Sequence, residues 1–427
     1  PHCNAQLTKR KMDRAWITKF DSELNDTIRQ AKQVPVLINY SVGNKRYEKN
    51  PDEQDLALID KIENTEIPYW FPNDRMMEGK ETRRNDPAGI THVHHFYTKR
   101  NQMVLANLNL LMKNYSKMKW FFETLLINTT IMGRYGQRTG NVSGTLYVPS
   151  LIKDLNVLEY YVRKLNGPKG VITPFKKLIN DLNNIIVFNQ SSSKTEIVKD
   201  SCDYIFIDPP FGANLNYSEL NFIWESWLKV WTNNKQEAIE NSVQGKGATE
   251  YRKLMAACFK EAHRVLKPGR WMTVEFSNTK ASVWNNIQTA LAEAGFIVAN
   301  VSALDKKQGS FKAVTTPTAV KQDLVISAYK PNGGFEDRFE QEAQTEEGIW
   351  DFIRTHLKYL QATKKLGFDL VAIPERDPRI LYDQLIAYYV RKGYNVPIDS
   401  KDFQLGLSQR FSERDGMYFL PEQVAEY

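Results

Sequence analysis

The chain contains an apolar run, Tyr204-Ile205-Phe206-Ile207, that ends directly at Asp208-Pro209-Pro210-Phe211. β-Branched and aromatic residues in a run of this length predict a buried strand. Two consecutive prolines cannot continue a ladder of backbone hydrogen bonds, so the chain must turn where the strand ends. In open α/β sheets, ligands bind outside the carboxyl ends of the strands. The sequence therefore places Asp208 and Phe211 at a sheet edge that a ligand can reach.

An acid, two prolines and an aromatic ring at such an edge suit the methylation of an exocyclic amine on a nucleic-acid base. This amine is a poor nucleophile, because its lone pair is delocalised into the ring. A carboxylate and a backbone carbonyl that accept its two N–H groups would draw the nitrogen towards tetrahedral geometry. Pro209 presents a carbonyl without an N–H of its own, and Phe211 offers a flat face for an extruded base. The alternative interpretation is a strand-end turn with an incidental aromatic residue.

The motif from Asp208 to Phe211 resembles the signature of the DNA amino-methyltransferases, which make N6-methyladenine or N4-methylcytosine. Three further segments resemble parts of large bacterial and phage site-specific DNA methylases: Gly144–Ser150, Asn216–Trp224 and Arg414–Leu420. The resemblance implies S-adenosyl-L-methionine as cofactor and double-stranded DNA as partner, with a restriction or defence-system subunit as a further candidate partner. Within this family an acidic first position favours adenine over cytosine.

The pattern around the motif predicts an α/β fold, a Rossmann-like class I methyltransferase sheet with a mainly helical C-terminal extension. Apolar spacing predicts helices over 98–111, 217–231, 249–266 and 283–293, and strands over 271–276, 296–304 and 323–329. Two strands in succession at the end indicate the second half of a doubly wound sheet with a terminal antiparallel pair.

Four regions are expected along the chain. Residues 1–97 form an N-terminal basic insert or a partial zinc-knuckle region, and residues 98–330 form the methyltransferase core. Pro, Gly and a run of Glu and Gln predict a linker over 331–346. Residues 347–427 form a helical module, with amphipathic helices over 349–363 and 379–392, for target recognition or oligomerisation.

Further site residues follow from their positions at predicted strand edges. The family resemblance implies that Gln190 and Ser191, with Asp208, contact the cofactor. Polar residues near the motif are candidates for contacting the flipped base or the strand left behind: Asn214, Asn216, Tyr217, Ser218, Glu219, Ser277 and Asn278. For Asn216 and Ser218, capping of the next helix is an equally good interpretation. Three lysines between the last two strands could touch phosphates or lie on the surface: Lys306, Lys307 and Lys312.

The Gly-rich loop that holds the cofactor's amino-acid part in class I methyltransferases is not evident. Gly133–Gly136 and Gly140–Gly144 are better explained as turns or DNA-facing loops, because no convincing strand precedes them. Pro1-His2-Cys3 resembles the end of a Cys-Pro-His-Cys half-site, so Cys3 is a candidate remnant of a zinc site. We therefore expect the chain to be a fragment of a longer methylase whose cofactor loop lies upstream.

Composition narrows the class of protein further. The net charge is +7, and residues 1–120 carry 20 Lys and Arg against 15 Asp and Glu. This excess of positive charge favours binding to a polyanion such as nucleic acid. Three scattered cysteines argue against a disulfide framework. No run of about 18 apolar residues is present, so we expect no membrane span. The family resemblance implies a bacterial or phage protein, which we expect to be cytoplasmic.

Three histidines, His92, His94 and His95, lie within one heptapeptide. No carboxylate or cysteine follows at ligand spacing, so we expect strand or loop residues and no metal. For the whole chain, two alternatives to DNA methylation stay open. One is a non-catalytic fragment that binds DNA or partner subunits, and the other is an amino-methyltransferase acting on RNA.

Overall fold

The computed structural model describes residues 12–114, 116–136, 140–166, 185–187, 189–276, 281–304, 323–331, 334–366, 369–392 and 394–427. The chain divides into two compact units. The first comprises Pro1–Val187 and Asn216–Lys235, and the second comprises Phe188–Leu215 and Gln236–Tyr427. The chain therefore leaves the second unit just after the Asp208 motif and contributes one helix to the first.

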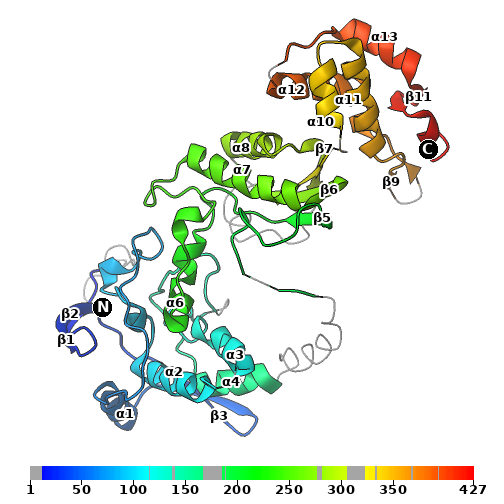
Figure 1. Cartoon of the computed structure of the whole chain (residues 1–427). Helices are drawn as coiled ribbons and strands as arrows, with labels where there is room; N and C mark the ends of the chain where they lie inside the picture. The colour runs from blue at the N-terminus through cyan, green and yellow to red at the C-terminus, as the bar shows by residue number, and fades with distance from the viewer. Residues whose placement is uncertain are drawn as a thin grey trace. The chain divides into compact units, whose positions relative to one another are not determined.

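The first unit combines two hairpins with a helical core. Its strands are β1 (Trp16–Asp21), β2 (Asp26–Ala31), β3 (Ile38–Val42) and β4 (Lys45–Lys49), and both pairs are antiparallel. Its helices are α1 (Glu53–Glu63), α2 (Lys99–Met112), α3 (Ser116–Leu126), α4 (Val157–Asn166) and α6 (Tyr217–Leu228), with short turns η2 (Asp86–Ala88), η3 (Val93–Phe96) and η5 (Asn234–Gln236). Figure 1 shows α2, α3 and α4 lying together in this unit.

The helix α2 begins where its sequence predicts. Thr98 caps α2, because its hydroxyl accepts the backbone N–H of Asn101. A core of aliphatic and aromatic side chains joins α2, α3 and α6. The Trp227 indole donates to the Tyr97 hydroxyl at 3.1 Å, and this hydroxyl donates to the Leu126 carbonyl at 3.1 Å. The indole N–H and the hydroxyl group thus both have hydrogen-bond partners in the core.

The second unit contains a partly parallel sheet with the strand order β5-β6-β8-β7. Its strands are β5 (Cys202–Ile207), β6 (Leu266–Phe276), β7 (Ile297–Leu304) and β8 (Asp323–Tyr329). β5 and β6 are parallel, whereas β8 lies between β6 and β7 and is antiparallel to both. The mixed α/β class and the antiparallel pair predicted at the end of the sheet are confirmed.

The helices α7 (Ala248–Val265) and α8 (Ala281–Glu293) pack against each other and cover one face of this sheet (Figure 1). Ile205 and Ile207 point to this covered face, as part of the core that includes Met272 and Val274. Gly295 follows α8 with a φ of +92°, as expected for a residue that ends a helix.

The prediction of a fully buried motif strand is wrong. Tyr204 and Phe206 are 55% and 57% exposed. Within the described part of the chain, β5 is an edge strand, and its alternate side chains face away from α7 and α8. An apolar run alone does not tell whether one or both faces of a strand are covered, since residues alternate between the faces.

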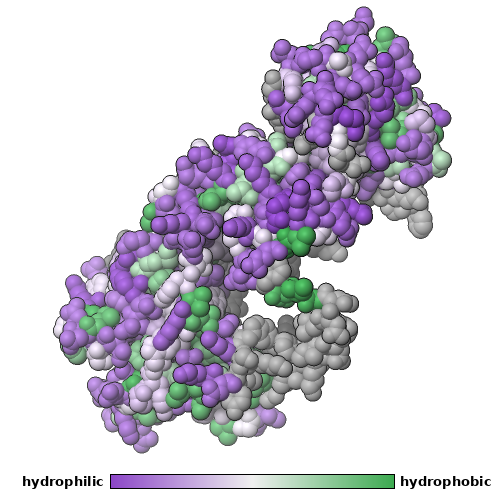
Figure 2. Space-filling model, in the orientation of Figure 1, coloured by the Kyte–Doolittle hydropathy of each residue, from purple (hydrophilic) through white to green (hydrophobic). Residues whose placement is uncertain are grey.

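The C-terminal part of the second unit is mainly helical. Its helices are α10 (Phe335–Glu342), α11 (Glu346–Tyr359), α12 (Pro378–Lys392) and α13 (Ser400–Arg410). Short elements connect and follow them: β9 (Lys365–Leu366), β10 (Asp369–Leu370), η6 (Pro374–Arg376), β11 (Ser412–Arg414), β12 (Met417–Phe419) and η7 (Pro421–Gln423). Most of the visible surface over α10 to α13 is hydrophilic (Figure 2).

The linker expected over 331–346 contains a helix instead. Phe335 and Phe339 in α10 are buried, and the Phe339 ring meets Tyr388 edge-on at 4.7 Å. Two aromatic residues four positions apart lie on one face of a helix. This pair outweighs the glycines and charged residues that predicted a linker. No helix within the described residues is both long and apolar enough to cross a membrane.

Candidate functional site

The Asp208 motif lies on a turn directly after the carboxyl end of β5, as the sequence predicts. Asp208 is exposed, whereas Pro209 is buried. Gly212 closes the turn with a φ of +66°, a conformation that favours glycine. The Gly212 carbonyl accepts the backbone N–H of Glu240 at 3.2 Å. The turn thus holds its carboxylate in solvent on a fixed backbone.

Two buried aromatic residues support this turn. The hydroxyl of Tyr251, in α7, donates to the Pro210 carbonyl at 2.7 Å. Burial raises the pKa of Tyr251 well above its ordinary value, so the hydroxyl keeps the proton that it donates. Phe211 is half-buried and packs edge-on against Phe276, the last residue of β6, with the ring centroids 5.3 Å apart. The Phe211 ring therefore takes part in the core of the sheet.

The candidate cofactor residues lie in the segment before β5. Gln190 is half-buried and its side-chain oxygen accepts the Glu196 N–H at 3.4 Å. Ser191 is exposed, and its hydroxyl is 2.9 Å from that of Ser193. The apolar residues 185–187 are exposed and do not form a strand. The structure thus shows local turn contacts at both candidates, and their cofactor role stays a prediction.

The glycine-rich segments form turns in the first unit. The Gly133 carbonyl accepts the N–H of Lys153 at 2.7 Å, and Arg134 forms an isolated bridge with Gly140. Gly136, Gly140 and Gly144 have positive φ values. Between β4 and β5, the described residues include no strand from which a cofactor loop would begin. This agrees with the interpretation of these glycines as turn residues.

The candidate substrate residues fall into separate groups. Asn214 is exposed in the second unit, whereas Asn216 and Tyr217 belong to the first unit, where Tyr217 is exposed. Asn216 occupies the N-cap position of α6, but its side chain makes no capping hydrogen bond. Several predicted positions lie outside the described residues: Cys3, Ser277, Asn278, Lys306, Lys307 and Lys312.

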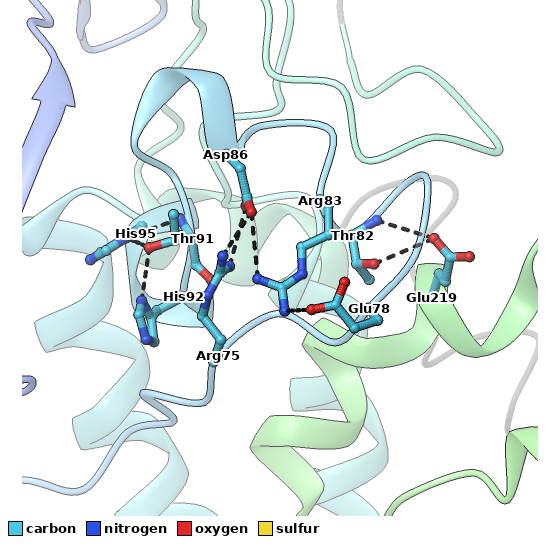
Figure 3. A network of polar contacts seen from close by, with 9 residues as sticks. All are labelled: Arg75, Glu78, Thr82, Arg83, Asp86, Thr91, His92, His95 and Glu219. Atoms are coloured by element: carbon cyan, nitrogen blue, oxygen red, sulfur yellow. Dashed lines mark hydrogen bonds and ion pairs between the residues drawn. The ribbon is translucent and has the colours of Figure 1, made fainter. Parts of the chain in front are cut away.

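Ser218 and Glu219 are buried, so neither is available to contact a base. A Glu219 oxygen accepts the backbone N–H of Glu81 at 2.7 Å. The same oxygen accepts the backbone N–H of Thr82 at 3.2 Å and lies 3.4 Å from the Thr82 hydroxyl (Figure 3). A Cβ on Gly79 would lie 2.2 Å from the Glu219 carboxyl carbon. Glu219 therefore fastens α6 to the 79–82 segment.

A polar cluster that sequence reasoning missed lies in the first unit. The Nε2 atoms of His94 and His95 are each 2.9 Å from one carboxylate oxygen of Asp21, and all three residues are buried. Burial raises the pKa of Asp21, but hydrogen bonds from both histidines outweigh this effect and lower it below its ordinary value. Burial and the neighbouring His94 lower the pKa of His95 to about 4.

The histidine triplet was the available sequence signal for this cluster. Sequence spacing gave no carboxylate partner for these histidines, because Asp21 comes from a hairpin 73 residues away from His94. Spacing rules for metal ligands detect only partners that are close in sequence.

No protein-family model and no curated protein matches the chain. Solved structures give distant matches. A provisionally assigned DNA modification methylase from Thermus thermophilus matches at 13% identity and a TM-score of 0.20, over 32% of this chain and 50% of that one. A methyltransferase from Methanosarcina mazei that depends on S-adenosylmethionine matches at 12% and 0.20, over 34% and 66%. The cyclase SpnF matches at 12% and 0.23, over 38% and 63%.

The chain is thus distantly similar in structure to methyltransferases that use S-adenosylmethionine, and it spans half the length of the first of them. TM-scores this low carry no argument about substrate, and one match is a cyclase. The chemistry must be argued from the residues of this chain.

Proposed function

We propose that the chain carries the base-binding part of an S-adenosyl-L-methionine-dependent DNA amino-methyltransferase, with adenine N6 favoured over cytosine N4. The observation that carries this proposal is the exposed carboxylate of Asp208 on a fixed turn after a parallel strand. Ligands of open α/β sheets bind at such strand ends. The antiparallel β8 between β6 and β7 further supports a class I methyltransferase sheet.

The proposed chemistry requires two acceptors for the amine of the flipped base. Asp208 accepts one N–H, and a backbone carbonyl of the motif accepts the other. The Pro210 carbonyl already accepts the Tyr251 hydroxyl, so we assign the second role to the Pro209 carbonyl, which the base must uncover because Pro209 is buried. The Asp208 carboxylate is already exposed on its turn, which lowers the cost of reorganisation in the transition state.

The cofactor fits the donor set of the second unit. Asp208 and Ser191 offer an exposed carboxylate and hydroxyl, and Gln190 a half-buried amide. Such groups can hydrogen-bond the hydroxyl and amine groups of S-adenosyl-L-methionine. When bound, the cofactor supplies an activated methyl group, so catalysis depends mainly on positioning.

A methyl-transfer assay on the full-length methylase to which the proposal assigns this chain tests the proposal. That protein is incubated with saturating S-adenosyl-L-methionine carrying a labelled methyl group and with unmethylated double-stranded DNA. We expect label in the DNA and, after hydrolysis to nucleosides, in N6-methyladenine. Label in N4-methylcytosine would correct the base, and label in RNA alone would favour the RNA alternative.

The non-catalytic alternative is tested in the same samples. Its motivation is the basic balance of the chain, which favours phosphate contacts irrespective of catalysis. DNA binding that weakens with salt, without any transfer of label to DNA or RNA, would contradict the enzyme and favour a binding fragment.

A further inference from the structure

We propose that Asp21, His94 and His95 form a binding site for a divalent transition-metal ion, with Zn²⁺ the expected ion, which ties the first hairpin to the helical part of the first unit. The ligand atoms of the three side chains all lie within 4.8 Å of one another. Two imidazole nitrogens and one carboxylate oxygen make a donor set that zinc prefers.

The geometry of the cluster is close to that of a metal site. Both histidines direct Nε2 at the same oxygen of Asp21, at 2.9 Å each. Ligands of a tetrahedral zinc ion, bound at roughly 2.0–2.1 Å, are about 3.3 Å apart. Each histidine nitrogen therefore needs to move only a few tenths of an ångström away from the Asp21 oxygen to reach this spacing.

The surroundings of the cluster support the ligands. The other Asp21 oxygen accepts the backbone N–H of Glu23 at 3.1 Å. The Thr91 hydroxyl is 3.4 Å from His95 Nδ1 and can accept its proton when Nε2 binds a metal (Figure 3). In the metal-free cluster, the Thr91 N–H donates to Nδ1 at 3.2 Å, so Nε2 carries the proton. Metal binding must therefore shift that proton and loosen this backbone contact.

Three protein ligands leave the fourth tetrahedral position to a water molecule, and the burial of all three ligands favours a structural over a catalytic role. Asp21, His94 and His95 are each only 8% exposed. Asp21 ends β1, and the two histidines lie in η3, just before α2. An ion would thus join two segments far apart in sequence, which is the arrangement by which structural zinc sites contribute to folding. This inference does not depend on the proposed methyl transfer.

The test measures metal content and stability of the full chain, purified without a histidine tag. The chain is loaded with Zn²⁺, freed of weakly bound ions by dialysis, and analysed by mass spectrometry for metal. We expect about one ion per chain, and we expect EDTA to lower the unfolding temperature of the first unit. Asp21→Asn and His95→Gln should lose the ion, because each removes one ligand.

Two variants serve as controls. His92→Gln makes the same substitution in the same heptapeptide, outside the three-residue cluster, and should keep the ion. Cys3→Ser should also keep it, which excludes a site at the N-terminus. If a ligand variant does not fold, the wild-type chain is loaded with Co²⁺ instead and its absorption spectrum tests the ligand set. The spectrum should show visible bands without sulfur-to-metal charge transfer. No retained ion, or retention by Asp21→Asn, would overturn the proposal in favour of a hydrogen-bonded cluster.

Discussion

The turn after β5 and the first turn of α6 each carry an acidic residue, and the two carboxylates lie in opposite environments. Asp208 is exposed, whereas Glu219, only eleven positions later, is 0% exposed and accepts two backbone N–H groups. From the sequence alone, both residues are candidates for the site. Nearness to a motif in the sequence therefore does not make a residue part of a site. An exposed carboxylate on a fixed turn can contact a ligand, whereas a buried carboxylate that already accepts hydrogen bonds from the backbone cannot.

The largest expected effect is on catalysis. Asp208→Asn should lower methyl transfer by roughly 100- to 1000-fold, because the amide replaces one of the two amine acceptors with a poorer one. The unfolding temperature should change little, since Asp208 is exposed. The measurement is the labelled methyl-transfer assay at saturating DNA.

The matched control is Asp203→Asn, which removes an exposed carboxylate from β5 and breaks its ion pairs with Lys267 at 2.9 Å and Arg270 at 3.5 Å. An exposed pair of this kind contributes little to stability. Near wild-type transfer by Asp208→Asn would remove the motif from the active site.

The other carboxylate should matter for stability. Glu219→Ala should destabilise the first unit by about 2–4 kcal/mol, because two buried backbone N–H groups lose their acceptor. Urea unfolding followed by tryptophan fluorescence reports on α6 through Trp224 and Trp227. Asn221→Ala, at an exposed position of the same helix, is the control and should change stability by less than about 0.5 kcal/mol.

A double-mutant cycle sharpens this second prediction. Gly79→Ala brings a methyl group into the space of the Glu219 carboxyl group and the Thr82 hydroxyl. It should therefore cost less stability in the Glu219→Ala background than in the wild type. Strictly additive effects would contradict the packing of Gly79 against Glu219.

The sequence predicted the helices and strands that follow the motif well, and it predicted the N-terminal elements and the long-range contacts poorly. The helices α7 and α8 follow from apolar spacing and from Gly295, which are local signals. The exposure of Tyr204 and Phe206 depends on which elements cover each face of the sheet, and the run itself does not encode this. The Asp21 cluster and the burial of Glu219 depend on partners 73 and 138 residues away, which no spacing rule detects.

A third ionisable group, His356, is buried and extends the comparison to pH. Burial, with a smaller contribution from the charge of Arg376, lowers the pKa of His356 to about 4. An unfolded histidine has a pKa near 6.5. The second unit should therefore be fully stabilised above pH 6.5 and lose stability as the pH falls towards 4, because only the unfolded chain takes up the proton.

Hydrogen exchange in α11 at pH 7.5 and pH 5 measures this loss, once corrected for the intrinsic exchange rate, and we expect about 2 kcal/mol. His356→Leu should remove most of the pH dependence, although the Tyr329 hydroxyl then loses its contact with Nδ1 at 3.3 Å. An unchanged pH dependence in this variant would assign the effect to other groups.

The smallest expected effect concerns the aromatic residue of the motif. Phe211→Ala should weaken capture of an extruded base by about 1–2 kcal/mol, since base–aromatic stacking contributes on this scale. Because the ring also packs on Phe276 at 5.3 Å, the variant should lose some stability as well.

Phe211→Tyr keeps the ring and is the matched control, so it should retain both capture and stability. A 2-aminopurine at the target position reports extrusion through its fluorescence. If Phe211→Ala lost stability but kept the fluorescence signal, Phe211 would have a structural role only, as Glu219 has in the first unit. Asp208 alone would then remain as the exposed part of the site.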